Sequence, residues 1–205
     1  MTPPSEAHAT ANGARGAAGR KPELYNGIGA TRAPVHRSTK TYDHSEGLSC
    51  CFRQWRAHSH CRLIHGYALA FRFVFATREL DECGWCFDFG GLKPVRAWLH
   101  EMFDHTMLVA ADDPDLPDFK RLEEKGLMAL RVLPKVGCEA TAEHVFRHVA
   151  RFVAEQTAGR VWLETVEVRE HGGNSALYEG GTHEPGGVGR SLGTLGELGG
   201  ITIAR

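Results

Sequence analysis

The stretch "CRLIHGYALAFRFVFA", residues 61–76, decides the fold class and also carries candidate chemistry. From residue 67 onward, large apolar side chains alternate with small or polar ones, a period of two that is typical of a β-strand. The large set is Tyr67, Leu69, Phe71, Phe73 and Phe75. Residues 36–53 are predicted as a first strand or bent strand, so a hairpin is expected.

Two helical patterns and two further strands follow. Apolar side chains from Leu92 to Phe103 recur on one helical face, and this helix is expected to end near Asp104. A polar connection, residues 112–126, separates it from a second helix that we expect to begin with Thr141 as its N-cap. Residues 161–170 and 175–180 are predicted as strands.

This order of elements, two strands, two helices and two strands, predicts an α+β fold. A sheet with one apolar face and helices with one apolar stripe each bury those surfaces against one another. We therefore expect an antiparallel four-stranded sheet with two helices on one face.

Composition restricts the possible partners. The chain has 24 Lys and Arg against 25 Asp and Glu, so no overall basic field argues for nucleic acid or an anionic membrane. It contains neither a long apolar span nor the apolar segment of a secretory signal, which predicts a cytoplasmic protein. Residues 1–34 and 181–205 are predicted as flexible tails around one domain at 35–180, because they are rich in Gly and small residues.

Soft and borderline metal ligands are dense around residue 61. His58, His60, Cys61 and His65 form the pattern H-x-H-C-x-x-x-H, which suits zinc chemically but matches no standard structural zinc spacing. Chance crowding is the alternative, because the chain has 12 histidines. The six cysteines are irregularly spaced, which favours free thiols, and the C-x-x-C pattern at 83–86 is predicted as a turn.

Several motifs together resemble the family of 6-pyruvoyltetrahydropterin and 6-carboxytetrahydropterin synthases. "CRLIHGY" at 61–67 is similar to the family's C-x-x-x-H-G-H, and "FDFGGLK" at 87–93 to its V-x-D-F-x-x-L-K. "FDHTML" at 103–108 resembles L-D-H-x-x-L, "ATAEHV" at 140–145 resembles P-T-x-E-N, and "VEVREHGGNSALY" at 166–178 resembles V-x-V-x-E followed by an aromatic residue. The motifs occur in the family's order, and the resemblance implies its tunnelling fold.

The resemblance also implies roles for individual residues. Cys61 falls on the family's catalytic thiol, which as a thiolate exchanges protons at the pterin side chain. His105, oriented by Asp104, falls on a second proton-transfer unit, and Glu170 falls on the glutamate that anchors the pterin ring. Thr141 and Glu143 are further pocket candidates.

The family binds zinc through three histidines, and this chain departs from that set at two positions. Phe52 stands about where the first histidine belongs, Tyr67 replaces the last, and His65 remains. Two interpretations stay open. Either His58 or His60 completes a zinc site with His65, or the site holds no metal and Tyr67 contacts the substrate together with arginines; the second is slightly favoured.

Arginines near the thiol indicate an anionic ligand. Arg53, Arg56 and Arg62 suit the phosphate oxygens of a triphosphate-bearing dihydropterin. Their interleaving with Phe52 and Trp55 is a weaker sign of single-stranded nucleic acid, and solvated loop arginines are the third possibility.

We therefore expect a lyase that acts on 7,8-dihydroneopterin triphosphate. Its product would be the 6-carboxy or the 6-pyruvoyl tetrahydropterin, the former in the queuosine and deazapurine route. The resemblance implies a homo-oligomeric barrel with the active site between subunits. The alternative is a non-catalytic pterin- or purine-binding protein of the same fold that has lost the zinc site.

Overall fold

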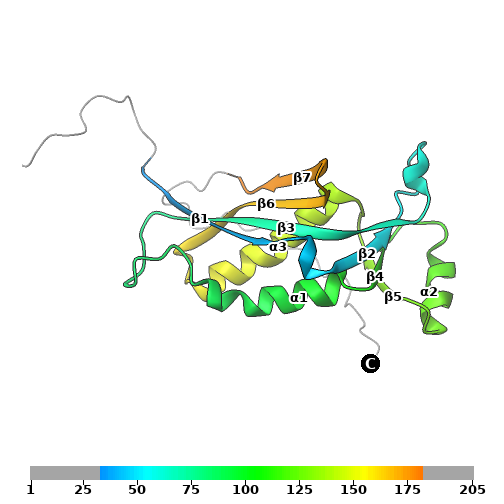
Figure 1. Ribbon diagram of the computed structural model, residues 1–205, viewed down its shortest axis with the longest axis horizontal. Helices are drawn as coiled ribbons and strands as arrows, with labels where there is room; N and C mark the ends of the chain where they lie inside the picture. Colours follow the sequence, from blue (N-terminus) through cyan, green and yellow to red (C-terminus); the bar gives the residue numbers. More distant parts are fainter. Residues whose placement is uncertain (1–32, 182–205) are drawn as a thin grey trace, which may run out of the picture. The chain divides into compact units, whose positions relative to one another are not determined.

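The computed structural model describes residues 33–181, which form a mixed sheet with three α-helices (Figure 1). The elements are β1 (His36–Tyr42), β2 (Leu48–Phe52), β3 (His65–Thr77), α1 (Lys93–Phe103), β4 (Thr106–Ala110), α2 (Leu116–Glu124), β5 (Ala129–Leu133), α3 (Cys138–Gln156), β6 (Val161–His171) and β7 (Asn174–Glu179). Residues 1–32 and 182–205, which hold most of both predicted tails, lie outside the described residues.

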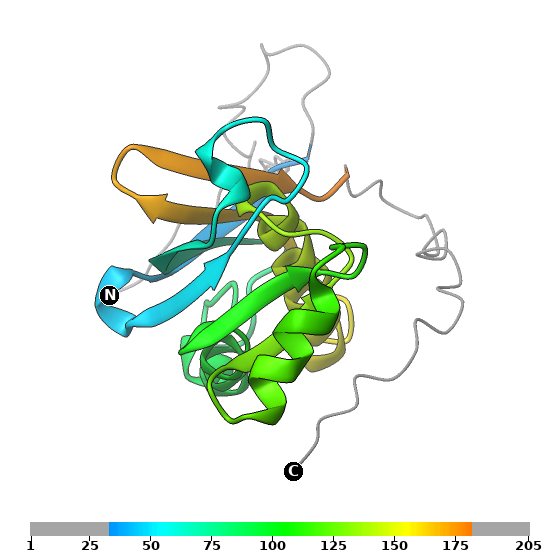
Figure 2. The same cartoon turned by 90° about the vertical axis from the view of Figure 1, so that its right-hand side faces the viewer.

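The long strand β3 organises the sheet. The strand order is β5-β4-β2-β3-β6-β7, and β1 also pairs with β3. β1, β2 and β6 run antiparallel to β3, whereas β2, β4 and β5 are parallel to one another (Figure 1, Figure 2). The predicted α+β class is confirmed, but the four-stranded antiparallel sheet is wrong, because the sheet has seven strands and is mixed.

The missing strands have a physical explanation. β4 is "TMLVA", and all five of its residues are buried, so it shows no alternation between apolar and polar side chains. β5 is equally short. Parallel strands covered on both faces lose the period of two that identifies an antiparallel strand from its sequence.

The predicted first strand is two strands, because the chain bends at Asp43. The Asp43 carboxylate accepts from the backbone N–H of Ser45 and caps a 3-10 turn, His44–Glu46. Gly47 then takes a φ of 73°, a left-handed conformation that glycine adopts at little cost. β1 and β2 therefore both pair with the 13-residue β3, one after the other.

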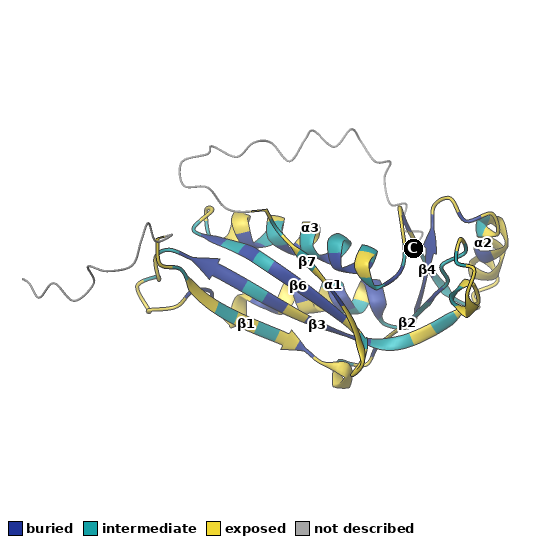
Figure 3. Cartoon of the chain, turned by 90° about the horizontal axis from the view of Figure 1, so that it is seen from above, coloured by how far each residue is buried: buried dark blue, intermediate teal, exposed yellow. Residues whose placement is uncertain are grey.

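The main core lies between β3 and the helices α1 and α3. Phe71, Phe73 and Phe75 are fully buried, and each contributes about 1.5–3 kcal/mol relative to an exposed position. The predicted apolar face of α1 is confirmed, since Val95, Leu99, Met102 and Phe103 are buried. Figure 3 shows α3 packed along the sheet with its buried positions toward the strands. No helix in the described part of the chain is long and apolar enough to cross a lipid bilayer.

α3 begins earlier than predicted. Its first residue is Cys138, preceded by Gly137 with a φ of 110°, so Thr141 is a buried residue of the first turn and not the N-cap. The Thr141 N–H donates to the carbonyl oxygen of Gly137, which closes that turn.

α2 forms within the predicted polar connection. It buries a single residue, Phe119, so the sequence shows no apolar stripe there. Phe119 packs in a small second core with Met107, Val109 and Leu130, which ties α2 to β4 and β5. A proline in the first turn is compatible with this helix start.

Candidate functional site

Cys61 lies in the loop that joins β2 to β3. It is the middle residue of a 3-10 turn, His60–Arg62, whose N-cap Ser59 accepts from the Cys61 N–H at 3.3 Å. The Cys61 carbonyl oxygen accepts from the Gln54 N–H at 2.9 Å. Both backbone groups of Cys61 are therefore held, so the position of its side chain depends little on the rest of the loop.

The H-G-Y motif begins β3, where the two strands approach closely. A Cβ atom at Gly66 would lie 2.5 Å from the backbone oxygen of Cys50. Glycine is therefore required for β2 and β3 to pair at this point, which brings Phe52 opposite His65 and Cys50 opposite Tyr67.

Phe52, His65 and Tyr67 form an aromatic cluster at the three positions where the family pattern has histidines. The ring centroids of His65 lie 4.8 Å from Phe52 and 5.9 Å from Tyr67, and those of Phe52 and Tyr67 lie 6.3 Å apart. His65 Nδ1 donates to the carbonyl oxygen of Leu63 at 2.7 Å, so Nε2 carries the lone pair when the ring is neutral.

This donor set does not fit a zinc site of three histidines. The aromatic cluster offers one imidazole, one phenol and a phenyl ring that has no donor atom. The side chains of His58 and His60 are exposed, and residues 33–181 contain no group of three His, Cys, Asp or Glu side chains placed to hold a metal ion. The predicted ligands His58, His60 and His65 are thus not gathered around one point.

Tyr67 links the thiol to a carboxylate. Its pKa is raised by burial first, and then by the negative charges of Glu170 and Cys61, so Tyr67 lies within electrostatic reach of each of these two groups. Glu170 is near the end of β6, and the next residue, His171, lies with its ring centroid 5.8 Å from that of Tyr67. We call these three residues the Cys61–Tyr67–Glu170 cluster.

Other thiols near this cluster are held in the protonated form. Burial raises the pKa of Cys50 to about 12 and that of Cys138 to about 11, and Glu170 adds to the effect at Cys138. Burial also raises the pKa of Cys51. The Cys138 thiol donates to the carbonyl oxygen of Val168 at 3.2 Å and the Cys51 thiol to that of Thr106 at 3.7 Å, whereas the partly exposed Cys61 thiol makes no hydrogen bond among residues 33–181. Cys61 is therefore the thiol best placed to act on a ligand.

Asp104 and His105 form a pair at the end of α1. His105 has a φ of 55°, which is uncommon for a residue with a side chain, and its N–H donates to the carbonyl oxygen of Ser49 at 2.7 Å. His105 Nδ1 donates to Asp104 Oδ1 at 2.5 Å, which leaves Nε2 available on a side chain that is 89% exposed. Asp104 thereby fixes the ring's tautomer and its orientation.

The Asp104–His105 pair has further titratable neighbours, His100 and Glu46, which the sequence did not reveal. His100 Nδ1 lies 3.4 Å from Asp104 Oδ2, and its Nε2 lies 3.4 Å from Glu46 Oε2. Hydrogen bonds from His105 first, and then from His100, lower the pKa of Asp104. The i, i+4 spacing of His100 and Asp104 on α1 is the signal that could have indicated this contact.

The described contacts of Asp104 and His105 run to His100 and Ser49, and none of them reaches the Cys61–Tyr67–Glu170 cluster. Within one chain, the Tyr67 phenol lies within electrostatic reach of the predicted thiol and of the predicted anchoring carboxylate. The predicted Asp104–His105 pair forms apart from these groups.

The remaining predicted substrate contacts already have protein neighbours. Arg53 donates to both oxygens of Asp113, at 2.9 and 2.5 Å, and to Asp115 at 2.6 Å. Glu143 is bound by Arg147 at 2.7 Å. Thr141 is buried in the first turn of α3, and Arg62 is exposed beside Cys61.

The C-x-x-C pattern lies in a turn, as predicted. Asp81 accepts from the backbone N–H groups of Cys83 and Trp85, which fixes the turn, and Cys83 is exposed while Cys86 is buried.

Comparisons with known proteins agree on one family. The family described as 6-pyruvoyl tetrahydropterin synthase matches residues 41–181. A 6-carboxy-5,6,7,8-tetrahydropterin synthase from Rickettsia bellii is 30% identical over 57 residues, which are 27% of this chain and 41% of that protein. That similarity thus spans less than half the length of the relative.

Solved structures show the same fold. An uncharacterized protein from Wolinella succinogenes is similar with a TM-score of 0.61 and 19% identity, over 71% of this chain and 98% of that one. A catalytic-residue mutant of Plasmodium vivax 6-pyruvoyltetrahydropterin synthase is similar with a TM-score of 0.54 and 14% identity, over 71% and 97%. At these identities, the likeness concerns the fold alone.

Proposed function

Because this chain belongs to the 6-pyruvoyl tetrahydropterin synthase family, we propose that it is a lyase acting on 7,8-dihydroneopterin triphosphate. The observation that carries the proposal is the Cys61–Tyr67–Glu170 cluster, in which the phenol lies within electrostatic reach of both the thiol and the carboxylate. A thiol serves proton transfer, and a carboxylate serves the anchoring of a flat nitrogen-rich ring.

Glu170 holds the pterin in this proposal. A carboxylate accepts two hydrogen bonds in one plane, which matches the ring N–H and amino group of a pterin. On β3, the ring of Tyr67 and the partly exposed ring of His65 lie next to each other and offer faces against which the bicyclic ring can pack.

Cys61 and His105 move protons. In the elimination of triphosphate, a base removes a proton from the substrate's side chain, the C–O bond to triphosphate breaks, and the electron pair leaves with triphosphate. We assign the proton at the side-chain carbon to Cys61 as thiolate. The proton exchanged at the side-chain oxygens goes to His105 Nε2, which the hydrogen bond of Nδ1 to Asp104 leaves available.

The two halves come from different subunits in this proposal. Within one chain, the described contacts of His105 do not reach Cys61, and the His105 side chain is largely exposed. A neighbouring subunit would therefore supply the Asp104–His105 pair to the Cys61–Tyr67–Glu170 cluster. The exposed strands at the sheet ends, β5 and β7, offer unpaired edges for such an assembly.

Zinc takes no part in this proposal. The aromatic cluster of Phe52, His65 and Tyr67 lacks two of the three imidazoles that such a site uses, so His65 and Tyr67 are assigned to packing against the substrate.

Turnover tests the proposal directly. Purified chain is incubated with 7,8-dihydroneopterin triphosphate, released triphosphate is followed by phosphorus NMR, and the pterin product is identified by mass spectrometry. Cys61→Ala should abolish release, while Cys83→Ala, an exposed cysteine in the Asp81-capped turn, should retain it. Equal release by Cys61→Ala and the unchanged chain would overturn the mechanism, and tight binding without any release would favour the non-catalytic alternative.

A further inference from the structure

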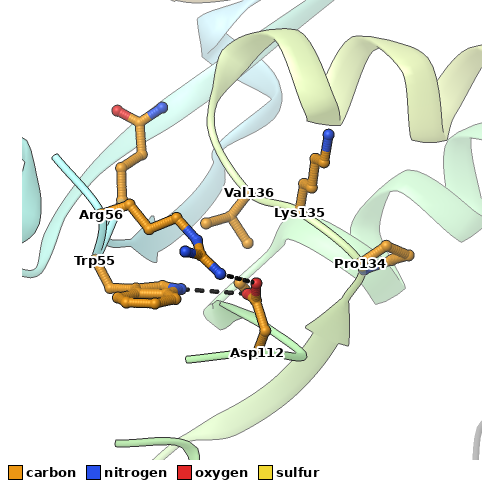
Figure 4. A pocket seen from close by; sticks show the side chains of 8 residues that line it. Trp55, Arg56, Asp112, Pro134, Lys135 and Val136 are labelled. Atoms are coloured by element: carbon orange, nitrogen blue, oxygen red, sulfur yellow. Dashed lines mark hydrogen bonds and ion pairs between the residues drawn. The ribbon is translucent and has the colours of Figure 1, made fainter. Parts of the chain in front are cut away.

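A cavity of about 240 Å³ lies where the parallel strands of the sheet end. β2, β4 and β5 run in the same direction, with Phe52 opposite Leu108 and Ala110 opposite Leu133, so their carboxyl ends meet at one edge. Open parallel sheets bind ligands at this edge, since the connecting loops leave a crevice there. The lining residues are Gln54, Trp55, Arg56, Ala110, Asp112, Pro134, Lys135 and Val136 (Figure 4).

The floor of this cavity is held in place by its own contacts. The Arg56 guanidinium lies over the Trp55 ring, 4.0 Å from its centroid. Asp112 accepts from both residues, from Trp55 Nε1 at 3.2 Å and from Arg56 Nη2 at 2.7 Å (Figure 4). Because one carboxylate fixes both side chains, the guanidinium is oriented before any ligand arrives.

The cavity is lined by more cationic side chains than acidic ones. Arg56 uses Nη2 on Asp112, and no other hydrogen bond of its five N–H groups is formed among residues 33–181. Lys135 also lines the cavity, where its ammonium group points away from Asp112, and its side chain makes no ion pair within the described part of the chain (Figure 4). With Asp112 as the single acidic residue of the lining, the cavity carries one surplus positive charge.

Part of the wall is apolar. Ala110, Pro134 and Val136 line the cavity beside the charged groups. A ligand that fits both parts needs an anionic head rich in acceptors and a compact apolar body.

We propose that this cavity binds a small organic anion. Its phosphate or carboxylate group lies between Lys135 and Arg56, and its body packs on Val136 and Pro134. This site is separate from the Cys61–Tyr67–Glu170 cluster, and Gln54 is the link between them, since it lines the cavity while its N–H holds the Cys61 carbonyl oxygen. The binding site therefore goes beyond the proposed lyase activity and does not depend on it.

The indole N–H of Trp55 provides a local readout. Nitrogen-15 NMR spectra of the full chain are recorded during titration with phenyl phosphate, with benzoate, with inorganic phosphate and with neutral benzyl alcohol. Trp55→Phe identifies the resonance by its loss. We expect saturable shifts with phenyl phosphate or benzoate, and the tighter of the two identifies the preferred head group.

Matched variants test the role of the charge. Lys135→Gln should weaken binding of the better anion about tenfold, because a charge-assisted hydrogen bond is lost. Lys125→Gln, which removes a cation at the end of α2 outside the cavity, should leave the affinity unchanged. The proposal is overturned if no anion gives a saturable shift, if benzyl alcohol binds as tightly as benzoate, or if Lys135→Gln and Lys125→Gln behave alike. Binding of inorganic phosphate as tight as that of phenyl phosphate would overturn the role of the apolar wall.

Discussion

Replacing Arg53 should show how much the buried ion pair between Arg53 and Asp113 contributes to the stability of the folded chain. The Asp113 side chain is 0% exposed and the Arg53 side chain 18% exposed, and two hydrogen bonds join them. Burial alone would raise the pKa of Asp113, but the hydrogen bonds from Arg53 and from the Asp115 N–H, together with the charge of Arg53, outweigh it and hold that pKa below the ordinary 3.8. Arg53→Met keeps an apolar side chain beside the Phe119 ring but leaves the buried carboxylate with the Asp115 N–H and without the charge of Arg53.

Breaking one side of a buried ion pair costs about 3–5 kcal/mol. For a domain of this size, the loss corresponds to a fall in Tm of roughly 6–20 °C. Arg53→Met combined with Asp113→Asn should recover much of the loss, because no buried charge then remains. Arg121→Met, which breaks an exposed pair with Asp118 on α2, is the matched control and should cost about 1 kcal/mol or less.

The pH dependence gives a second check. In the unchanged chain, the lowered pKa of Asp113 adds stability above pH 3.8 that is lost as the pH falls through the folded value. In Arg53→Met, the hydrogen bond from the Asp115 N–H still opposes the effect of burial but the charge of Arg53 is lost, so that pKa rises and protonation reduces the variant's loss of stability as the pH falls. Urea unfolding followed by circular dichroism should show a difference in the free energy of unfolding between the unchanged chain and Arg53→Met that is large at pH 7 and small near pH 4. A difference below about 1 kcal/mol at pH 7, or one that does not decrease toward pH 4, would refute the reasoning.

Two further outcomes follow from the aromatic cluster and from the contact between α1 and α3. Phe52→His combined with Tyr67→His should create a stoichiometric zinc site with His65, measured by elemental analysis, because the three rings already surround one point; no gain over the unchanged chain would count against that geometry. Burial lowers the pKa of His144, which lies beside Trp98, so stability should fall below about pH 6.5 as the unfolded chain takes up protons first. His144→Leu should flatten this part of the urea midpoint profile, and an unchanged slope would contradict the assignment.

Periodicity predicted the elements that bury one face. β3, α1, β6 and β7 each alternate or repeat at the expected spacing, and the structure contains all of them. Periodicity did not predict β4, β5 or α2. The strands β4 and β5 are short and have no regular alternation, and the helix α2 buries only Phe119. The start of α3 was predicted too late, at Thr141, because threonine is a common N-cap residue. The actual N-cap is Gly137, which has a positive φ and no side chain that would mark it in the sequence.

The candidate site was predictable only in part. The order of motifs pointed to Cys61, Tyr67 and Glu170, and the fold places Tyr67 within electrostatic reach of the other two, although about 100 positions separate Cys61 from Glu170. The acidic partners of Arg53 and Arg56 could not be predicted from the sequence, since Asp113 and Asp112 lie in a segment that was recognisable only as a polar connection. Contacts of this kind depend on parallel pairing between β2 and β4, which no local pattern encodes.

Mixing two inactive variants tests the account most directly. Cys61→Ala and His105→Ala chains are unfolded together, refolded as mixed oligomers and assayed for triphosphate release from 7,8-dihydroneopterin triphosphate. If the Cys61–Tyr67–Glu170 cluster of one subunit works with the Asp104–His105 pair of another, the mixture should regain up to about a quarter of the activity, because a quarter of its sites are intact. Two folded, assembled variants that stay inactive when mixed would contradict a site shared between subunits.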